Sequence, residues 1–471
     1  MLTMLSSRLI RRLCCLAALL AAVGCAARPG PSSGIVLPAH LAAATAEPAN
    51  WPSADWWSGF GSPELDRLIE AAITANFDVR AAIARVRQAD AQVRITGQSL
   101  LPSGNLTGNV SRSQTPRSTA TAASGAGTGF VRRTLYATGL QASYEIDFWG
   151  RNRAAVESAQ QAASANRFEV GAVTLTTQAS VANTYFQILA ASEELAIRQQ
   201  NLAAAERILG AVNQRMAVGT GNGLEVAQQQ ALVDQQRAAI PPLRQAVQQN
   251  TYSLGTLIGR IPEAVPAPLL TLAALRVPAV QPGLPAEVII RRPDVWQAEA
   301  TLAAAQASVE SARAAMFPAI TLSASGGFQN VMIENVLRPG SVLLNIAGGL
   351  TQPVFQFGQL RAQLRLTQAQ QDEVLENYRQ AIVAALVDVE NAIVALREIS
   401  EQETLQVSAT QSAQRAYDIS LAQLRAGTID VITLLITQQS LFNSRISLAQ
   451  VRLARFQAAV GLFRALGGGW A

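Results

Sequence analysis

The chain repeats itself once, and this duplication constrains the fold more than any other feature of the sequence. Three short motifs of the first half recur in the same order in the second: LP at 101–102 as FP at 317–318, WGRNRA at 149–154 as FGQLRA at 357–362, and VGT at 218–220 as AGT at 426–428. The offset is 216 residues for the first motif and 208 for the other two. A Ser/Thr/Gly-rich run over 111–129 accounts for the difference as a longer loop. The sequence therefore predicts two copies of one structural unit.

Each copy follows the same plan of one helical stretch, two strand-like segments and two very long helical stretches. The helical stretches are expected at about 63–98, 151–217 and 224–257 in the first copy, and at about 286–315, 359–425 and 429–466 in the second. Six prolines crowd the segment between the copies, over 262–285. Because proline cannot sit inside a helix, this segment is predicted to be an extended linker.

These patterns divide the chain into six predicted segments. They are a signal peptide at 1–24, a lipid-anchored extension at 25–62, a first repeat at 63–258 with strands near 101–110 and 134–148, a Pro-rich linker at 259–285, a second repeat at 286–466 with strands near 317–329 and 342–357, and a tail at 467–471.

The strand-like segments alternate between apolar and polar residues. In the segment 136–148, Leu140, Ile146 and Phe148 share one face, whereas Gln141 and Glu145 lie on the other. The segments 105–110, 320–325 and 344–351 alternate in the same way. Segments of about ten residues with this pattern are typical of transmembrane β-barrels. An ordinary antiparallel sheet that covers a soluble core alternates identically, so the alternation alone leaves both interpretations open.

Four strands cannot close a barrel with a lumen, because the smallest barrels need about eight. Open sheet edges are not tolerated in lipid either. A membrane interpretation therefore requires strands from several copies, and three copies would supply 12 strands. In this chain no other stretch after the N-terminal region reaches the roughly 18 apolar residues of a transmembrane helix.

The long helical stretches are too long for a compact domain, since the stretch 151–217 alone would extend about 100 Å. In the second repeat, apolar or small side chains recur every three or four residues, as in a coiled-coil seam. These positions are Leu360, Leu364, Thr367, Gln371, Val374, Tyr378, Ile382, Ala385, Val389, Ala392 and Leu396. The pattern fits both a coiled-coil rod and the wall of a water-filled tube.

Composition excludes much catalytic chemistry. All 37 basic residues are arginines, and His40 is the single histidine of the chain. P-loops, protein kinases and Schiff-base enzymes need a lysine. Most serine, cysteine and metal hydrolases need histidine, so no metal site or cofactor is expected. Carboxylate chemistry stays possible, with Glu145 and Asp147 as the pair to examine. The net charge of +5 is spread out, which does not support nucleic-acid binding.

The N-terminus has the pattern of an export signal. Arg8, Arg11 and Arg12 precede an apolar run over 13–23, which is too short to span a bilayer. The run ends in small residues directly before Cys25, as in a bacterial lipobox, so Cys25 is the expected site of acylation, for example by palmitate. Cleavage before Cys25 would remove Cys14 and Cys15. Ala26, rather than an aspartate, follows and favours sorting to the outer membrane.

In addition, several motifs resemble the TolC family of outer-membrane efflux factors, and within it the lipid-anchored branch of NodT and OprM type. The resemblance covers about 56–470. The motifs are Trp56-Trp57 with Leu65-Asp66, Tyr144-Glu145-Ile146-Asp147 before Trp149-Gly150-Arg151, Arg291-Arg292-Pro293-Asp294, Pro353-Val354-Phe355 before Gly358, and Leu466-Gly467-Gly468-Gly469-Trp470.

The resemblance implies a mainly α-helical homotrimer whose 12 strands form one barrel in the outer membrane, with a helical tunnel across the periplasm. A periplasmic adaptor and an inner-membrane pump would dock at the helical tip. The subunit would be a passive exit duct without catalysis. The alternative from the residues alone is a periplasmic coiled-coil structural or adaptor lipoprotein.

The tip is expected at the two turns between the long helices, and Gly219, Thr220, Gly427 and Thr428 are the implied adaptor contacts. Gly219 and Gly427 also suit helix C-termini, where the chain needs a left-handed residue. In the family, acids beyond the turn ring the closed pore. Glu225 and Asp430 are the candidates here, although each could equally be a solvated acid near a helix start. Thr433 and Ile436 stand where relatives often carry aspartates.

Overall fold

A computed structural model describes residues 33–42, 51–116, 130–261, 270–280 and 284–469. The chain forms two units, Met1–Ile35 and Val36–Ala471, and the fold described below belongs to the second. Cys25, the centre of the 111–129 run, several linker prolines and Trp470 lie outside the described residues. No helix in the described ranges is both long and apolar enough to cross a membrane.

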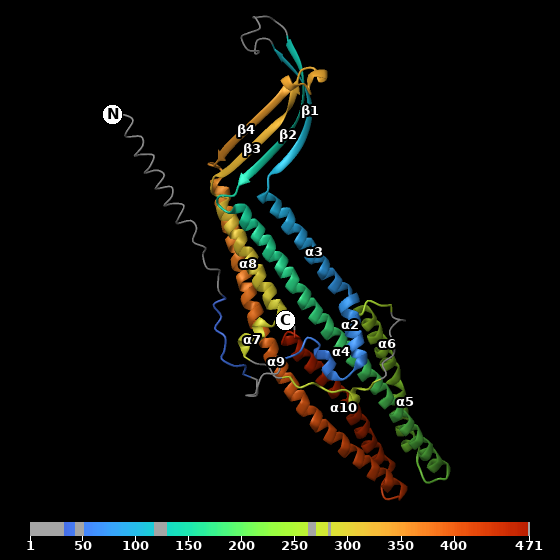
Figure 1. The fold of residues 1–471 in the computed structure, drawn as a ribbon. Coiled ribbons are helices and arrows are strands. Elements are labelled where there is room, and N and C mark those ends of the chain that lie inside the picture. The colour runs from blue at the N-terminus through green and yellow to red at the C-terminus, as the bar shows by residue number, and fades with distance from the viewer. Residues whose placement is uncertain (1–32, 43–50, 117–129, 262–269, 281–283, 470–471) are drawn as a thin grey trace. The chain divides into compact units, whose positions relative to one another are not determined.

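The two repeats have the same order of elements, except that two helices at the end of the first correspond to one helix at the end of the second (Figure 1). The first contains α2 (Pro63–Ala75), α3 (Phe77–Gly97), β1 (Ser103–Pro116), β2 (Phe130–Ile146), α4 (Arg151–Ala217), α5 (Gly223–Ala238) and α6 (Ile240–Leu257). The second contains α7 (Pro285–Ile290), α8 (Pro293–Ala314), β3 (Ala319–Asn330), β4 (Val342–Thr351), α9 (Phe357–Arg425) and α10 (Val431–Ala465). Short 3-10 helices lie at Trp56–Phe60, Gln98–Leu100, Leu272–Ala274, Ile333–Asn335 and Pro339–Ser341.

The long helices α4 and α9 confirm the expected helical stretches, whereas three other stretches each divide into two helices. Pro241 and Pro242 stand in the first turn of α6 and separate it from α5, because proline fits a first turn but not a helix interior. Pro293 separates α8 from α7 in the same way. Between α2 and α3, Asn76 accepts hydrogen bonds from the N–H groups of Asp78 and Val79 and starts a new helix.

The four strands form one antiparallel sheet in the order β1-β2-β3-β4. Each repeat contributes one hairpin, and the β2–β3 pair joins the repeats through residues such as Leu140 opposite Gly326. β1 and β4 are the two edges, and neither pairs on its outer side with any strand of the described residues. The strands are longer than expected in the first repeat, and β4 ends at Thr351 rather than near 357.

The expected seam of α9 is confirmed by burial. Its positions from Leu360 to Leu396 are all buried or half-buried, and Ile382, Ala385 and Val389 are the most enclosed. α9 packs against α8 and α10. One cluster of aromatic residues lies around Trp56 and Phe60, where Trp56 stacks on Phe463 at 5.0 Å and Phe186 lies 4.9 Å from Phe456.

Each repeat fastens the end of its last helix to the break between its first two helices. In the first repeat, Gly259 has a φ of 66°, and a Cβ there would lie 2.5 Å from the carbonyl oxygen of Ala75. The next residue, Asn76, donates through Nδ2 to the carbonyl of Leu257 at 2.8 Å. We call this contact the first joint.

The second joint lies at the equivalent positions of the second repeat. Gly467 has a φ of 86°, and a Cβ there would lie 2.1 Å from the carbonyl oxygen of Arg291. Arg292 donates through Nη1 to the carbonyl of Ala465 at 3.1 Å. Its guanidinium also binds Asp294 at 2.6 Å and Asp388 at 3.2 Å. The Arg-Arg-Pro-Asp and Leu-Gly-Gly-Gly motifs therefore meet in one contact.

Candidate channel wall and helical tip

The strand register separates the side chains of the sheet into two faces. Residues paired directly across neighbouring strands share a face, and successive residues alternate, so even-numbered positions lie together on all four strands. Its polar positions are Thr134, Thr138 and Asn330, with Arg112, Gln114 and Arg132 at the end of β1 and β2 farther from the helices. The remaining larger side chains between 104 and 350 are apolar: Leu106, Val110, Tyr136, Leu140, Ala142, Tyr144, Ile146, Ile320, Leu322, Ala324, Phe328, Val342, Leu344, Ile346 and Leu350. Many of these are more than half exposed, including Leu106 at 81% and Leu344 at 76%. An exposed apolar area of this extent marks a surface that contacts a nonaqueous neighbour.

The odd-numbered face is polar and almost uncharged. It carries Ser103, Asn105, Thr107, Asn109, Gln141, Ser143, Thr321, Ser323, Ser325, Gln329, Asn345 and Thr351, with small residues and the larger apolar Leu343 between them. From the end of the sheet next to the helices as far as the pair of Asn109 and Ala137, Glu145 is the one charged side chain on this face. Neutral amides and hydroxyls bind water without the strong electric field of charged side chains. This face therefore suits contact with water and passing solutes.

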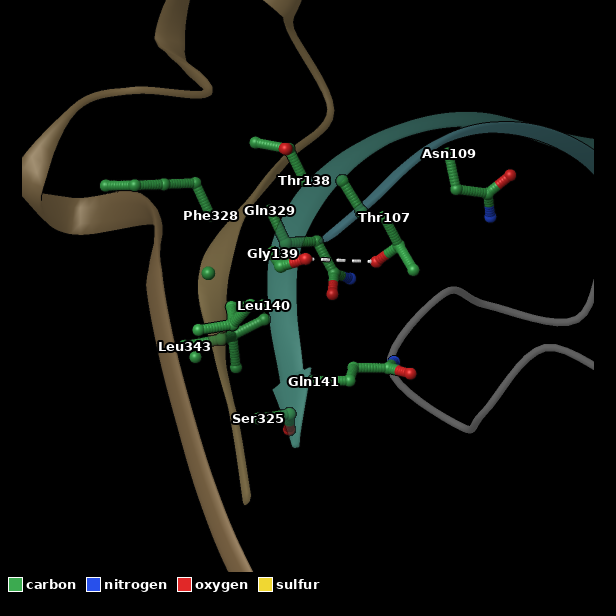
Figure 2. A pocket seen from close by; sticks show the side chains of 13 residues that line it. Thr107, Asn109, Thr138, Gly139, Leu140, Gln141, Ser325, Phe328, Gln329 and Leu343 are labelled. Carbon is green, nitrogen blue, oxygen red and sulfur yellow. Dashed lines mark hydrogen bonds between the residues drawn. The ribbon is translucent and has the colours of Figure 1, made fainter. Parts of the chain in front are cut away.

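The centre of the polar face is a shallow hollow in which the backbone is exposed (Figure 2). Gly139 lies opposite Gly327, and a Cβ on Gly327 would lie 2.3 Å from the carbonyl oxygen of Thr138. Thr107 Oγ1 donates to the carbonyl of Gly139 at 3.2 Å. Phe328 extends away from the side on which Thr107 and Gln141 lie (Figure 2). Only glycine fits this close approach of β2 and β3.

The two acids that were candidates for carboxylate chemistry form the connection between the sheet and α4. Glu145 binds Arg151 at 2.6 Å. Asp147 accepts hydrogen bonds from the N–H groups of Asn152 and Arg153 and from Arg153 Nε. Burial alone would raise the pKa of Asp147, but these hydrogen bonds hold it below its ordinary value. Both carboxylates therefore serve structural contacts.

The two tip turns have the same cap geometry. Gly219 and Gly427 have φ values of 76° and 74°, which confirms the expected left-handed residues. Thr220 donates its N–H and its Oγ1 to the carbonyl of Arg215, and Thr428 does the same to Gln423. All four residues are exposed. Capping explains their pattern fully, and contact with a partner stays a prediction.

The candidate aperture acids occupy different positions in their turns. Asp430 is the N-cap of α10 and accepts hydrogen bonds from Thr433 N–H and Oγ1, which lower its pKa. Its counterpart in the first repeat is Asn222, which caps α5 by accepting from Glu225 N–H. Glu225 is therefore the counterpart of Thr433, not of Asp430. The sequence interpretation missed this pairing, although the offset of 208 residues could have revealed it.

Other expectations about sites have these outcomes. Cys25 lies outside the described residues, so its acylation stays a prediction. His40 is exposed. Among the described residues, no group of three or more His, Cys, Asp or Glu side chains is arranged to hold a metal ion.

An amphipathic sheet that continues into long paired helices defines the subunit of a membrane channel. The family model of the outer membrane efflux protein matches residues 68–260 and 284–468. The chain belongs to this outer membrane efflux protein family, which includes the TolC-type channels.

Individual relatives agree with this assignment. The pyoverdine export outer membrane protein OpmQ of Pseudomonas aeruginosa PAO1 is 40% identical over 95% of this chain and 94% of its own. The solved outer-membrane channel OprN has a TM-score of 0.88 at 25% identity, over 95% of this chain and 100% of its own. The open-state MtrE channel of Neisseria gonorrhoeae has a TM-score of 0.84 at 28% identity, over 94% of this chain and 98% of its own.

The chain is accordingly an outer-membrane exit duct subunit of a tripartite efflux system, and its relatives are transport proteins rather than enzymes. The alternative of a periplasmic structural or adaptor lipoprotein is wrong, because the matched relatives are outer-membrane channels over nearly their full length.

Proposed function

We propose that three copies of this chain close a 12-stranded channel in the outer membrane, with Cys25 acylated and the helical tip bound to a periplasmic adaptor and its inner-membrane pump. The observation that carries the proposal is the pair of free sheet edges, β1 and β4, on either side of an amphipathic sheet. Lipid cannot satisfy the backbone groups of an open edge. Pairing β1 of one copy with β4 of the next satisfies every edge once the ring closes.

Cysteine cross-linking tests this ring directly. Asn105→Cys in β1 would be combined in turn with Asn345→Cys, Ala347→Cys and Gly349→Cys in β4, which samples neighbouring registers on the polar face. Oxidation should give covalent dimers and trimers for at least one pair, because a disulfide needs Cβ atoms about 4 Å apart. Asn105→Cys with Ser323→Cys in the interior strand β3 is the matched control and should stay monomeric. Cross-linking of the control alone, or of no pair, contradicts the proposal.

The aperture role of Glu225 and Asp430 is a separate part of the proposal. Glu225 Oε2 is buried and has no hydrogen-bond partner among the described residues, whereas the Asp430 carboxylate is exposed. If these acids line a narrow opening, Glu225→Gln and Asp430→Asn should each lower the preference of the channel for cations. Asp418→Asn on α9 is a charge-matched control. Unchanged ion selectivity in both variants would restrict Asp430 to helix capping and Glu225 to its contact with Asn222.

The substrate class follows from similarity to OpmQ. Two OpmQ proteins, which the chain resembles at 40% and 39% identity over 95% and 98% of its length, carry out pyoverdine export by name. We infer that this chain conducts a polar secreted solute of the same class, which the neutral polar face would accommodate. The chain should restore extracellular pyoverdine to a Pseudomonas aeruginosa strain lacking OpmQ. Restored secretion of other solutes but not of pyoverdine would contradict the inference.

A further inference from the structure

A cluster of arginines lies at the end of the sheet that is farther from the helices (Figure 1). Among the described residues of the four strands, arginine occurs at three positions, Arg112, Arg132 and Arg133, and all three are exposed. They belong to the hairpin of β1 and β2, and the sequence holds no acid from 91 to 144. The nearest acid along the chain, Glu145, lies at the opposite end of β2. This end of the hairpin is therefore positively charged.

The hairpin extends beyond the other two strands. The last row that joins β2 to β3 pairs Tyr136 with Asn330. β1 and β2 stay paired as far as Pro116 opposite Phe130. The outermost rows of the hairpin, which carry the arginines, therefore project past β3.

The alternation of side chains separates the three arginines. Arg112 lies opposite Thr134 and Arg132 opposite Gln114, all on the even-numbered face, whereas Arg133 lies on the odd-numbered polar face. Arg112 and Arg132 are thus diagonal neighbours, with side chains that start about 7–8 Å apart. Arg132 Nε donates to Gln114 Oε1 at 2.9 Å, which is a neutral partner. An anionic group between the two guanidinium groups would bind both and offset their repulsion.

The length of the apolar face places this pair at the depth of lipid headgroups. Along β2 the face runs from Tyr136 to Ile146, a span of about 33 Å at the rise of a β-strand. Barrel strands tilt by about 35–45°, so this span covers about 25 Å, which is the height of the apolar band on outer-membrane barrels. Arg112 and Arg132 lie two and four residues beyond the last apolar row, about 5–10 Å outside that band.

The end of the sheet that carries the arginines is the end at the cell surface, because the helices extend into the periplasm in this family of outer-membrane channels. Lipids of the bacterial outer leaflet are glycolipids with phosphate groups on their sugars. The planar fork of a guanidinium matches phosphate with two parallel hydrogen bonds. Pairing of the sheet edges between copies uses backbone groups and leaves the even-numbered face free for lipid.

We propose that Arg112 and Arg132 bind a phosphate group of an outer-leaflet glycolipid at the rim of the apolar face. The inference rests on the proposed ring of three copies, because a closed sheet turns this face to lipid and the polar face to the bore. It assigns a ligand to the outside of the channel. Arg133, on the opposite face of the same hairpin, has no part in this site.

Binding of fluorescently labelled lipid A to the detergent-purified full-length trimer tests the proposal. Phosphorylated lipid A is compared with the same lipid after its phosphates have been removed. The phosphorylated form should bind at least about tenfold more tightly and should lose affinity with salt. Arg112→Gln with Arg132→Gln should weaken its binding by about tenfold or more. Arg112→Lys with Arg132→Lys should lose less, because lysine keeps the charge without the planar fork.

A matched pair of single variants separates this site from a general effect of charge. Arg132→Gln and Arg133→Gln each remove one cation from the same hairpin, on opposite faces. Arg132→Gln should lose about fivefold in affinity, and Arg133→Gln should bind as the wild type does. Equal binding of the two lipids, or equal loss in the two variants, overturns the proposal.

The proposed ring and the lipid site fail in distinguishable ways. A trimer that conducts and cross-links through β1 and β4, but does not prefer the phosphorylated lipid, overturns this inference and leaves the duct intact. A chain that stays monomeric and does not cross-link overturns both.

Discussion

The first and second joints form the same backbone contact, but different side chains stabilise it. In both, a glycine with positive φ brings the end of the last helix against a backbone carbonyl, and the next side chain after that carbonyl reaches back to the helix end. The first joint uses the neutral amide of Asn76. The second uses the buried guanidinium of Arg292, which also holds Asp294 and Asp388. The duplicated backbone geometry is kept, whereas the side-chain chemistry has diverged.

The shared glycines should be the most sensitive positions. In Gly467→Ala the new Cβ would lie 2.1 Å from the carbonyl of Arg291, and in Gly259→Ala it would lie 2.5 Å from that of Ala75. Positive φ adds strain, so each variant should lose about 3 kcal/mol or more of unfolding free energy. Gly61→Ala is the control, with φ of 74° and nothing within 4 Å. Thermal unfolding of the detergent-purified protein should show a small loss for Gly61→Ala and large losses for the other two.

Removing the side chain of Arg292 should destabilise the protein more than removing that of Asn76. Arg292→Ala leaves the buried carbonyl of Ala465 without its partner and removes the cation from two partly exposed carboxylates, so we expect a loss of about 2–3 kcal/mol. Asn76→Ala removes a helix cap and one hydrogen bond and should cost about 1–2 kcal/mol. The same unfolding measurement compares them. A larger loss in Asn76→Ala would contradict the assignment of the ionic joint as the stronger one.

Acid should weaken only the second joint. Burial opposes ionisation of Asp294, but Arg292 outweighs it and lowers the pKa of Asp294 below its ordinary value. A lowered folded-state pKa gives stability that is present at neutral pH and is lost as pH falls from about 4 through the folded pKa. Arg292→Met should therefore lose less stability than the wild type between pH 6 and acidic pH of about 3. Asn76→Ala should keep the wild-type pH dependence.

The tip caps should show the smallest difference between the repeats. Asn222 and Asp430 cap equivalent helices with a side-chain oxygen, so Asn222→Ala and Asp430→Ala should each cost about 1 kcal/mol. Asp430→Asn should retain most of the capping energy, because asparagine caps nearly as well as aspartate. Local hydrogen exchange at the first turns of α5 and α10 would measure both effects. Protection that is unchanged in Asp430→Ala would contradict its capping role.

Local patterns predicted most of the secondary structure. The period of two identified the strands, and Gly219 and Gly427 identified the tip caps. The breaks at Asn76, Pro241 and Pro293 had signals in the sequence, but the long apolar periodicity on both sides concealed them. The joints could not be predicted, because Asn76 and Leu257 are 181 residues apart and meet only in the folded chain. The order of the sheet, with β2 beside β3, likewise depends on contacts between the repeats.

The candidate site likewise has one part that local sequence predicts and another that depends on contacts between the repeats. The alternating faces of the sheet follow from local sequence, and the register aligns them across all four strands. The hollow around Gly139 and Gly327 was not predicted, because β2 and β3 come from different repeats and pair only in the folded chain.

Single-channel conductance in a planar bilayer, with the mass of the detergent-purified protein determined in parallel, tests the central claim most directly. The account predicts a trimer that gives discrete conductance steps, and predicts that Glu225→Gln and Asp430→Asn alter those steps. A trimer without steps would be examined again with the same two variants, since a closed tip also blocks current. A monomer without conductance would leave two sheet edges unpaired and would contradict the channel assembly proposed for this chain.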